Sequence, residues 1–108
     1  MTNETCTSTP VGITLRVIGG KWKLLILWHV KDQPVRFGEL MHQMKGITQK
    51  MLTQQLRELE ADGLIKRNVF AEIPPRVDYV ITEYGKTLLP ILELLCVWGK
   101  SHMSKVKK

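Results

Sequence analysis

The fold is decided by the stretch Ile47-Thr-Gln-Lys-Met-Leu-Thr-Gln-Gln-Leu-Arg-Glu-Leu-Glu-Ala-Asp-Gly63. Its leucines recur at helical spacing and predict one buried stripe, made of Leu52, Leu56 and Leu59. A second face gathers side chains that can read base edges or hold phosphates: Gln49, Lys50, Thr53, Gln54 and Arg57. The stretch therefore predicts an amphipathic helix that stops at Gly63 and exposes a nucleic-acid-binding face. A merely solvated helix face is the alternative.

The residues before this helix favour a helix-turn-helix. A short helix is expected at residues 37–44, Gly46 permits a tight connection, and the hydroxyl of Thr48 can cap the helix that follows. A helix, a short glycine-containing turn and a polar-faced helix form this motif. Further helices are expected at residues 11–18 and 21–31, and the second is apolar on nearly all faces and should be central.

A hairpin is expected after the polar-faced helix. Strand-like runs at residues 64–71 and 77–82 are rich in Ile, Val, Phe and Tyr. The intervening Glu72-Ile-Pro-Pro-Arg76 is too long and too proline-rich for a two-residue turn. It should present Arg76 at a rigid basic tip suited to phosphate or minor-groove contact. Because it follows a helix-turn-helix, the pattern favours a DNA-binding wing over an ordinary solvent-exposed loop.

The last helix is expected to run from Thr82 to about His102, kinked or split at Pro90. Its apolar residues cover an arc of about 220°, against the roughly 100° stripe that packing on one core requires. They are Leu88, Leu89, Ile91, Leu92, Leu94, Leu95, Val97 and Trp98. A small domain cannot bury both sides of such a helix. A partner chain related by a two-fold axis is the simplest cover.

Length and composition predict a single domain with a modest core, because the chain has 108 residues, 44% of them hydrophobic. The net charge of +6 suits a polyanion partner. Four of those charges come from the C-terminal lysines Lys100, Lys105, Lys107 and Lys108, which leaves the body at about +2. Charge thus supports nucleic-acid binding without establishing it. We expect a flexible arm at residues 1–9, the winged domain with dimerisation helices at 10–102 and a basic tail at 103–108.

The N-terminus lacks the basic start and apolar stretch of a secretion signal, and no apolar run approaches a membrane span. A cytoplasmic protein without a membrane partner is therefore expected. No histidine lies near a cysteine at metal-ligand spacing, and no phosphate loop or nucleophile elbow is present. We accordingly expect no metal, no cofactor and no catalysis. The acids at the end of the polar-faced helix are expected to be solvated: Glu58, Glu60 and Asp62.

Short motifs are spread over nearly the whole chain. They are Ile18-Gly-Gly-Lys-Trp22, Arg36-Phe-Gly-Glu-Leu40, Ile47-Thr-Gln-Lys-Met-Leu52, Leu56-Arg-Glu-Leu-Glu60, Asp62-Gly-Leu-Ile65, Pro74-Pro-Arg-Val77 and Leu95-Cys-Val-Trp-Gly99. From about Pro10 to His102 the chain resembles the HxlR-type transcription regulators, bacterial winged-helix proteins related to the MarR group. Together these motifs are specific, although one alone would not be.

The resemblance implies a mainly α fold with a small β-hairpin, a winged helix-turn-helix that dimerises through its N- and C-terminal helices. It also implies a homodimer on palindrome-like operator DNA, which represses, or occasionally activates, a nearby gene. The DNA-binding candidates are Thr48, Gln49, Lys50, Thr53, Gln54 and Arg57 in the major groove, Arg76 in the minor groove, and Arg36. The candidates for the dimer interface are Val11, Leu15, Leu92, Leu94, Leu95 and Trp98. The alternative function is a winged-helix protein-interaction module without DNA binding.

Many members of the family carry a cysteine just before the segment leading to Gly-Gly-Lys-Trp, and in several it senses oxidants, quinones or aldehydes. The matching position here is Thr9, and Cys6 lies upstream of it. A sensor thiol needs a nearby cation or helix N-terminus, and Cys6 has no cation beside it in sequence. Cys6 is the candidate for redox sensing. Because it lies outside the family position and has no cation beside it, an ordinary exposed thiol is the alternative. A small-molecule or electrophile effector is left open.

Overall fold

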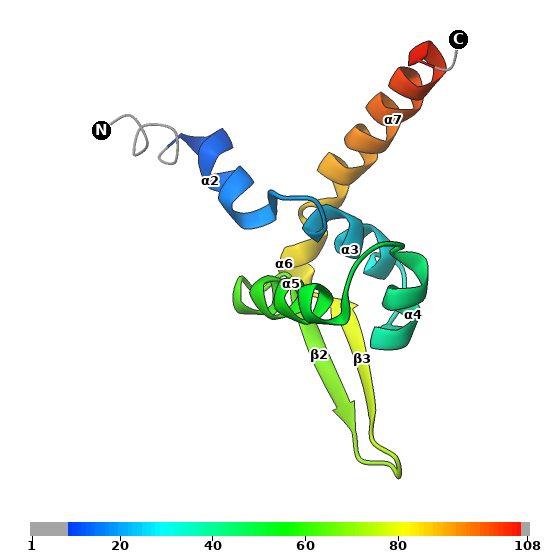
Figure 1. Ribbon diagram of the computed structural model, residues 1–108. Helices are drawn as coiled ribbons and strands as arrows, with labels where there is room; N and C mark the ends of the chain where they lie inside the picture. The colour runs from blue at the N-terminus through cyan, green and yellow to red at the C-terminus, as the bar shows by residue number, and fades with distance from the viewer. Residues whose placement is uncertain (1–8, 107–108) are drawn as a thin grey trace.

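The computed structural model describes residues 9–106. In chain order the elements are α2 (Pro10–Ile18), α3 (Lys23–Val30), β1 (Val35–Arg36), α4 (Phe37–Gln43), α5 (Gln49–Ala61), β2 (Ile65–Phe70), β3 (Arg76–Ile81), α6 (Glu83–Lys86) and α7 (Leu89–Val106). Figure 1 shows α3, α4, α5 and α6 gathered at the centre, with α2 and α7 projecting to one side and the β2–β3 hairpin to the other. This arrangement separates the hairpin from the two projecting helices.

The predicted helix-turn-helix is present as α4, a turn and α5. Gly46 has a φ of 93°, a left-handed conformation in which a side chain would be strained. The Thr48 hydroxyl oxygen accepts a hydrogen bond from the backbone N–H of Met51 at 3.0 Å and caps α5. At the other end Gly63, with a φ of 78°, turns the chain toward β2. The predicted start and stop of this helix are confirmed.

The sheet has three antiparallel strands in the order β1-β3-β2. The β2–β3 hairpin runs in register from Ile65 opposite Ile81 to Phe70 opposite Arg76. Strand β1 adds Val35 opposite Tyr79 at the free edge of β3. The sequence predicted the hairpin but not β1, because a strand of two residues has no alternation from which it can be recognised.

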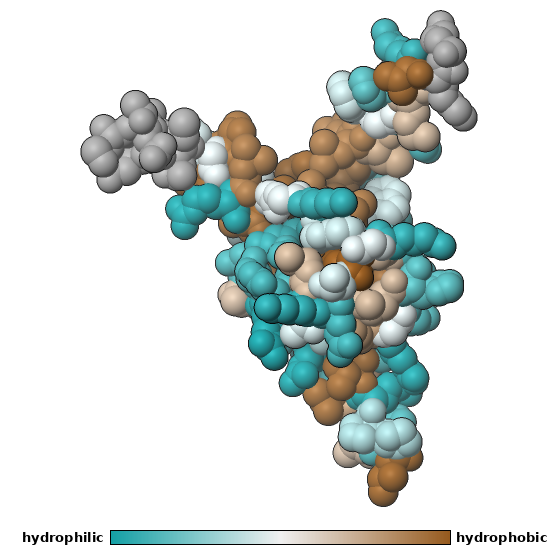
Figure 2. All heavy atoms as spheres, viewed as in Figure 1, coloured by the Kyte–Doolittle hydropathy of each residue, from teal (hydrophilic) through white to brown (hydrophobic). Residues whose placement is uncertain are grey.

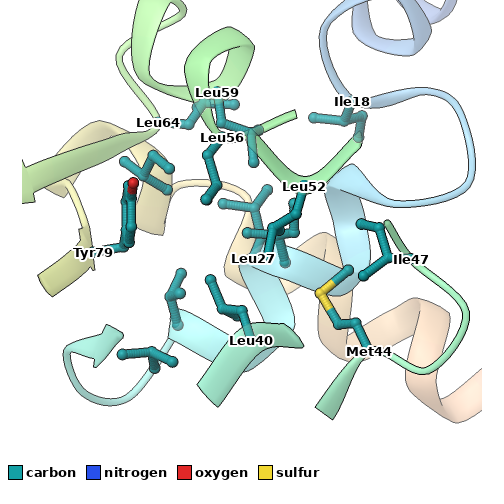
Figure 3. Close-up of a cluster of buried hydrophobic side chains, with 14 of the residues drawn as sticks. Ile18, Leu27, Leu40, Met44, Ile47, Leu52, Leu56, Leu59, Leu64 and Tyr79 are labelled. Carbon is teal, nitrogen blue, oxygen red and sulfur yellow. The ribbon is translucent and has the colours of Figure 1, made fainter. Parts of the chain in front are cut away.

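The core joins the helix-turn-helix to the sheet. Figure 3 shows side chains from α3, α4 and α5 pointing toward one another, among them Leu27, Leu40, Leu52 and Leu56. All four are almost completely buried, and burying each such side chain contributes roughly 1.5–3 kcal/mol. The leucine stripe of α5 therefore packs in the core, and the polar face of the helix is turned outward.

The predicted C-terminal helix is split rather than kinked. Helix α6 begins after Thr82, whose hydroxyl oxygen accepts from the N–H of Gly85 at 2.8 Å, and Thr87 is its C-terminal cap. Pro90 is the second residue of α7, where its missing N–H leaves no helical hydrogen bond unmade. Helix α7 continues to Val106, so residues 103–106, expected in a tail, are helical. None of the helices between residues 9 and 106 has the length and apolarity that a membrane crossing requires.

Candidate nucleic-acid interface

The outward face of α5 brings the predicted base-reading residues together. Together with Glu58, five of them line a shallow hollow of about 710 Å³: Gln49, Lys50, Thr53, Gln54 and Arg57. Thr53 and Glu58 are partly exposed and the others are exposed. All of these side chains stand on one rigid helix, so a duplex could meet their amides, hydroxyls and cations at the same time. Thr48 begins this helix, and its hydroxyl oxygen serves as the cap.

Glu58 is the residue of this face that the sequence did not predict. Its carboxylate receives the ammonium of Lys23, from α3, at 2.7 Å between Nζ and Oε1. The Gln54 amide nitrogen donates to its other oxygen, Oε2, at 3.2 Å. These bonds, the one from Lys23 first, hold the pKa of Glu58 below its usual range. The expectation of a purely solvated acid is therefore wrong. The spacing between Gln54 and Glu58 was readable from the sequence, but the contact with Lys23 was not.

Arg76 is not at the tip of the wing, where the sequence placed it. It is the first residue of β3, opposite Phe70, because the antiparallel ladder extends that far. Its guanidinium lies 4.0 Å from the centre of the Phe70 ring, and its Nη1 is 3.3 Å from Oε2 of Glu72. Only 32% of the side chain is exposed. The tip itself presents a fully exposed Ile73.

Arg36 and Arg76 flank a single acid, Asp78. Their Nε atoms lie 3.8 Å and 3.7 Å from Oδ1 of Asp78. Strand pairing causes this arrangement, because β1 places Arg36 opposite Asp78. The side chain of Arg36 is well exposed at the edge of the sheet. The two arginines thus meet at Asp78, on strand β3 of the wing and the neighbouring β1, and the carboxylates of Asp78 and Glu72 balance their two charges.

Arg67 is a further cation that the sequence analysis did not single out. It lies on β2 opposite Tyr79. It lines a hollow of about 250 Å³ between the sheet and α5, together with Thr53, Arg57 and Glu60. The alternation of residues along β2 could have predicted that Arg67 shares a face with Ile65 and thus faces α5.

The projecting helices α2 and α7 carry exposed apolar side chains, visible as brown surface in Figure 2. The predicted interface residues Val11, Leu15, Leu94, Leu95 and Trp98 are all exposed, Trp98 to 65%. Leu92 is a correction, because it is only 4% exposed and belongs to the hydrophobic core. Helix α7 contacts the core at this residue and at Leu89, and most of its other large apolar side chains are exposed in the single chain. Cys6, the redox-sensing candidate, lies outside the described residues.

The fold and its exposed helix agree with comparisons to known proteins. A family model described as HxlR-like helix-turn-helix matches residues 17–107. The chain belongs to this family. The expectation of an HxlR-type winged helix-turn-helix is therefore confirmed.

Two of the similar proteins are named as HTH-type transcriptional regulators. The HTH-type transcriptional regulator YtcD of Bacillus subtilis (strain 168) is 55% identical over 96 residues, which cover 89% of this chain and 76% of that protein. An HTH-type transcriptional regulator of Methanothermobacter thermautotrophicus (strain ATCC 29096 / DSM 1053 / JCM 10044 / NBRC 100330 / Delta H) is 52% identical over 94 residues, 87% of this chain and 72% of that protein.

Solved structures are equally similar. The redox regulator HypR in its reduced form superposes with a TM-score of 0.87 at 47% identity, covering 92% of this chain and 98% of that chain. The crystal structure of the HTH-type regulator ytcD gives a TM-score of 0.85 at 53% identity, with coverage of 89% and 98%. The family to which the chain belongs is thus one of transcriptional regulators.

Proposed function

We propose that the protein is a sequence-specific DNA-binding transcription regulator, a homodimer that represses a nearby gene from a palindrome-like operator. The observation that carries the proposal is the outward face of α5. Its amide, hydroxyl and cationic side chains line one hollow, while its leucines are fixed in the core. A helix presented in this way has the shape and the donor and acceptor groups that reading the major groove requires.

The arginines of the wing and of the neighbouring strand β1 support the same function. Arg36 and Arg76 lie on the neighbouring strands β1 and β3, with Arg76 in the last residue pair before the loop of the wing. A phosphate can replace Glu72 as the partner of Arg76, because both are anions and the guanidinium offers several donors. In this proposal the wing contacts the backbone or minor groove beside the segment that α5 reads.

A homodimer would cover the apolar faces of α2 and α7. Single soluble chains rarely leave large contiguous apolar surface in water, and these helices expose several large apolar side chains each. A two-fold axis at that end would direct both α5 helices to one face of a duplex. Their separation would then be about 34–36 Å, one turn of DNA. This geometry is the reason for expecting a palindrome-like operator.

The test is selection of binding sites from randomised duplex DNA, followed by affinity measurements on the selected site and a scrambled one. We expect preference for a two-fold repeat whose half-sites are one turn apart, and affinity that falls as salt rises. Repression is checked with a reporter driven by the operator, whose expression should rise when the regulator is deleted. A protein-interaction module without DNA binding would instead not be retained on immobilised heparin or on mixed duplex DNA.

A further inference from the structure

A chain of hydrogen bonds runs from the core to the exposed face of α5. Lys23, with 9% of its side chain exposed, contacts Oε1 of Glu58, and Glu58, 43% exposed, uses Oε2 to receive the amide of Gln54. One end is therefore anchored on α3, and the other end is a side chain available to DNA. Each oxygen of the carboxylate has its own partner.

The donors and acceptors permit only one orientation of the Gln54 amide. An ionised carboxylate accepts hydrogen bonds and cannot donate them. The nitrogen Nε2 must therefore face Glu58, since the carbonyl oxygen Oε1 would be repelled by it. One N–H of the amide is used in this contact. The oxygen Oε1 and the second N–H of Nε2 are left for another partner.

We propose that Glu58 and Lys23 are positioning residues that fix the Gln54 amide so that the helix selects adenine over guanine at one operator base pair. The major-groove edge of adenine offers the N6 donor beside the N7 acceptor, which matches an oxygen and one N–H. The edge of guanine offers two acceptors, O6 and N7, and requires two donors. The inference rests on the proposed DNA-binding function and assigns Lys23, which is nearly buried, a part in base selection.

Substitution of the carboxylate by an amide gives a sharp consequence. In Glu58→Gln the new side chain has a single carbonyl oxygen, and the ammonium of Lys23 can only donate to it. The NH2 group of the new amide then faces Gln54, whose own amide must turn over to accept through Oε1. Gln54 would present two N–H donors to the duplex. The preferred base should therefore change from adenine toward guanine.

The experiment measures affinity for the selected operator with each of the four base pairs at every position. Wild type should prefer adenine over guanine by roughly ten-fold at the position where Gln54→Ala abolishes preference. At that position Glu58→Gln should reverse the order, and Glu58→Ala should bring the ratio near one. Lys23→Met should weaken the preference, whereas Lys23→Arg, which retains a donor, should restore part of it. Glu60→Gln is the matched control, since it removes the same charge from an exposed residue of α5.

The outcomes separate this inference from the proposed function. A wild-type protein without any sequence preference overturns both. A specific wild-type complex in which Glu58→Gln keeps the wild-type order of bases, or in which Gln54→Ala changes no position, overturns this inference alone. Circular dichroism and thermal unfolding accompany each variant. If Lys23→Met does not fold, the variants of the half-exposed Glu58 still decide the matter.

Discussion

The hydroxyl of Thr82 donates a hydrogen bond to the backbone carbonyl of Gly63 at 2.6 Å. The same oxygen accepts from the N–H of Gly85 at 2.8 Å and so begins α6. One side chain thereby ties the end of the α5 segment to the start of the C-terminal helices. Helix α5 and the projecting helix α7 are therefore connected through Thr82 as well as through the core.

Thr82→Val should lower the free energy of unfolding by about 1–2 kcal/mol, because it removes a helix cap and leaves the Gly63 carbonyl without its partner. Chemical denaturation measures the change. Thr14→Val is the matched control, since the hydroxyl of Thr14 bonds only within α2, to Pro10. Equal effects of the two substitutions would contradict the role of Thr82 as a joint.

Arg76→Ala should weaken operator binding and reduce the slope of log K against log salt by roughly one, as expected for one lost phosphate contact. Stability should fall by about 1 kcal/mol, because the stack on Phe70 and partly exposed ion pairs disappear. Titration of DNA binding at several salt concentrations checks this. Arg76→Lys keeps the charge and should keep the slope. Unchanged binding by Arg76→Ala would remove this arginine from the mechanism.

Trp98→Glu should give a folded monomer with poor operator affinity, because a charge on the exposed apolar face of α7 opposes burial between two chains. Leu92→Ala should instead lower the stability of the domain by about 2–5 kcal/mol, since Leu92 lies in the core. Sedimentation and thermal unfolding distinguish the two effects. A wild-type protein that sediments as a monomer of 12.4 kDa at micromolar concentration would exclude the dimer.

Acid should remove the stabilisation that Glu58 contributes. Its pKa is lowered in the folded protein by Lys23 and Gln54. The contribution is therefore complete above the pKa of an unfolded glutamate, about 4.3, and is lost as the pH falls through the lower folded value. Between pH 6 and about pH 3, wild type should lose more stability than Glu58→Gln. Glu60→Gln should follow wild type, and identical pH profiles for wild type and Glu58→Gln would contradict the assignment.

Oxidation by diamide or a quinone should change operator affinity little. The family position for a sensing cysteine is occupied here by Thr9, and Cys6 has no neighbouring cation in sequence. Gel-shift titrations before and after treatment measure the effect, with Cys6→Ser as control. A large loss of binding that Cys6→Ser abolishes would show that the sensing thiol has moved along the N-terminal arm.

The sequence by itself determined most of the helices, the β2–β3 hairpin and the faces of α5. The leucine spacing of α5, its cap at Thr48 and the stop at Gly63 are local properties, because helix periodicity, capping and left-handed turns depend on residues within a few positions of one another. The β2–β3 hairpin was also predictable from its local sequence. The sequence likewise predicted more apolar surface on the C-terminal helix than one core can bury, and the exposed Trp98 confirms this.

Only the tertiary structure decided which side chains meet across elements. It put Arg76 within the β3 ladder, added β1 beside it, buried Leu92 and joined Lys23 to Glu58. These outcomes depend on strand register and on the packing of helices distant in sequence, and neither leaves a periodic signal in the chain. The exposed polar face of α5 could thus be predicted from sequence, whereas the residues of other elements that contact its side chains could not.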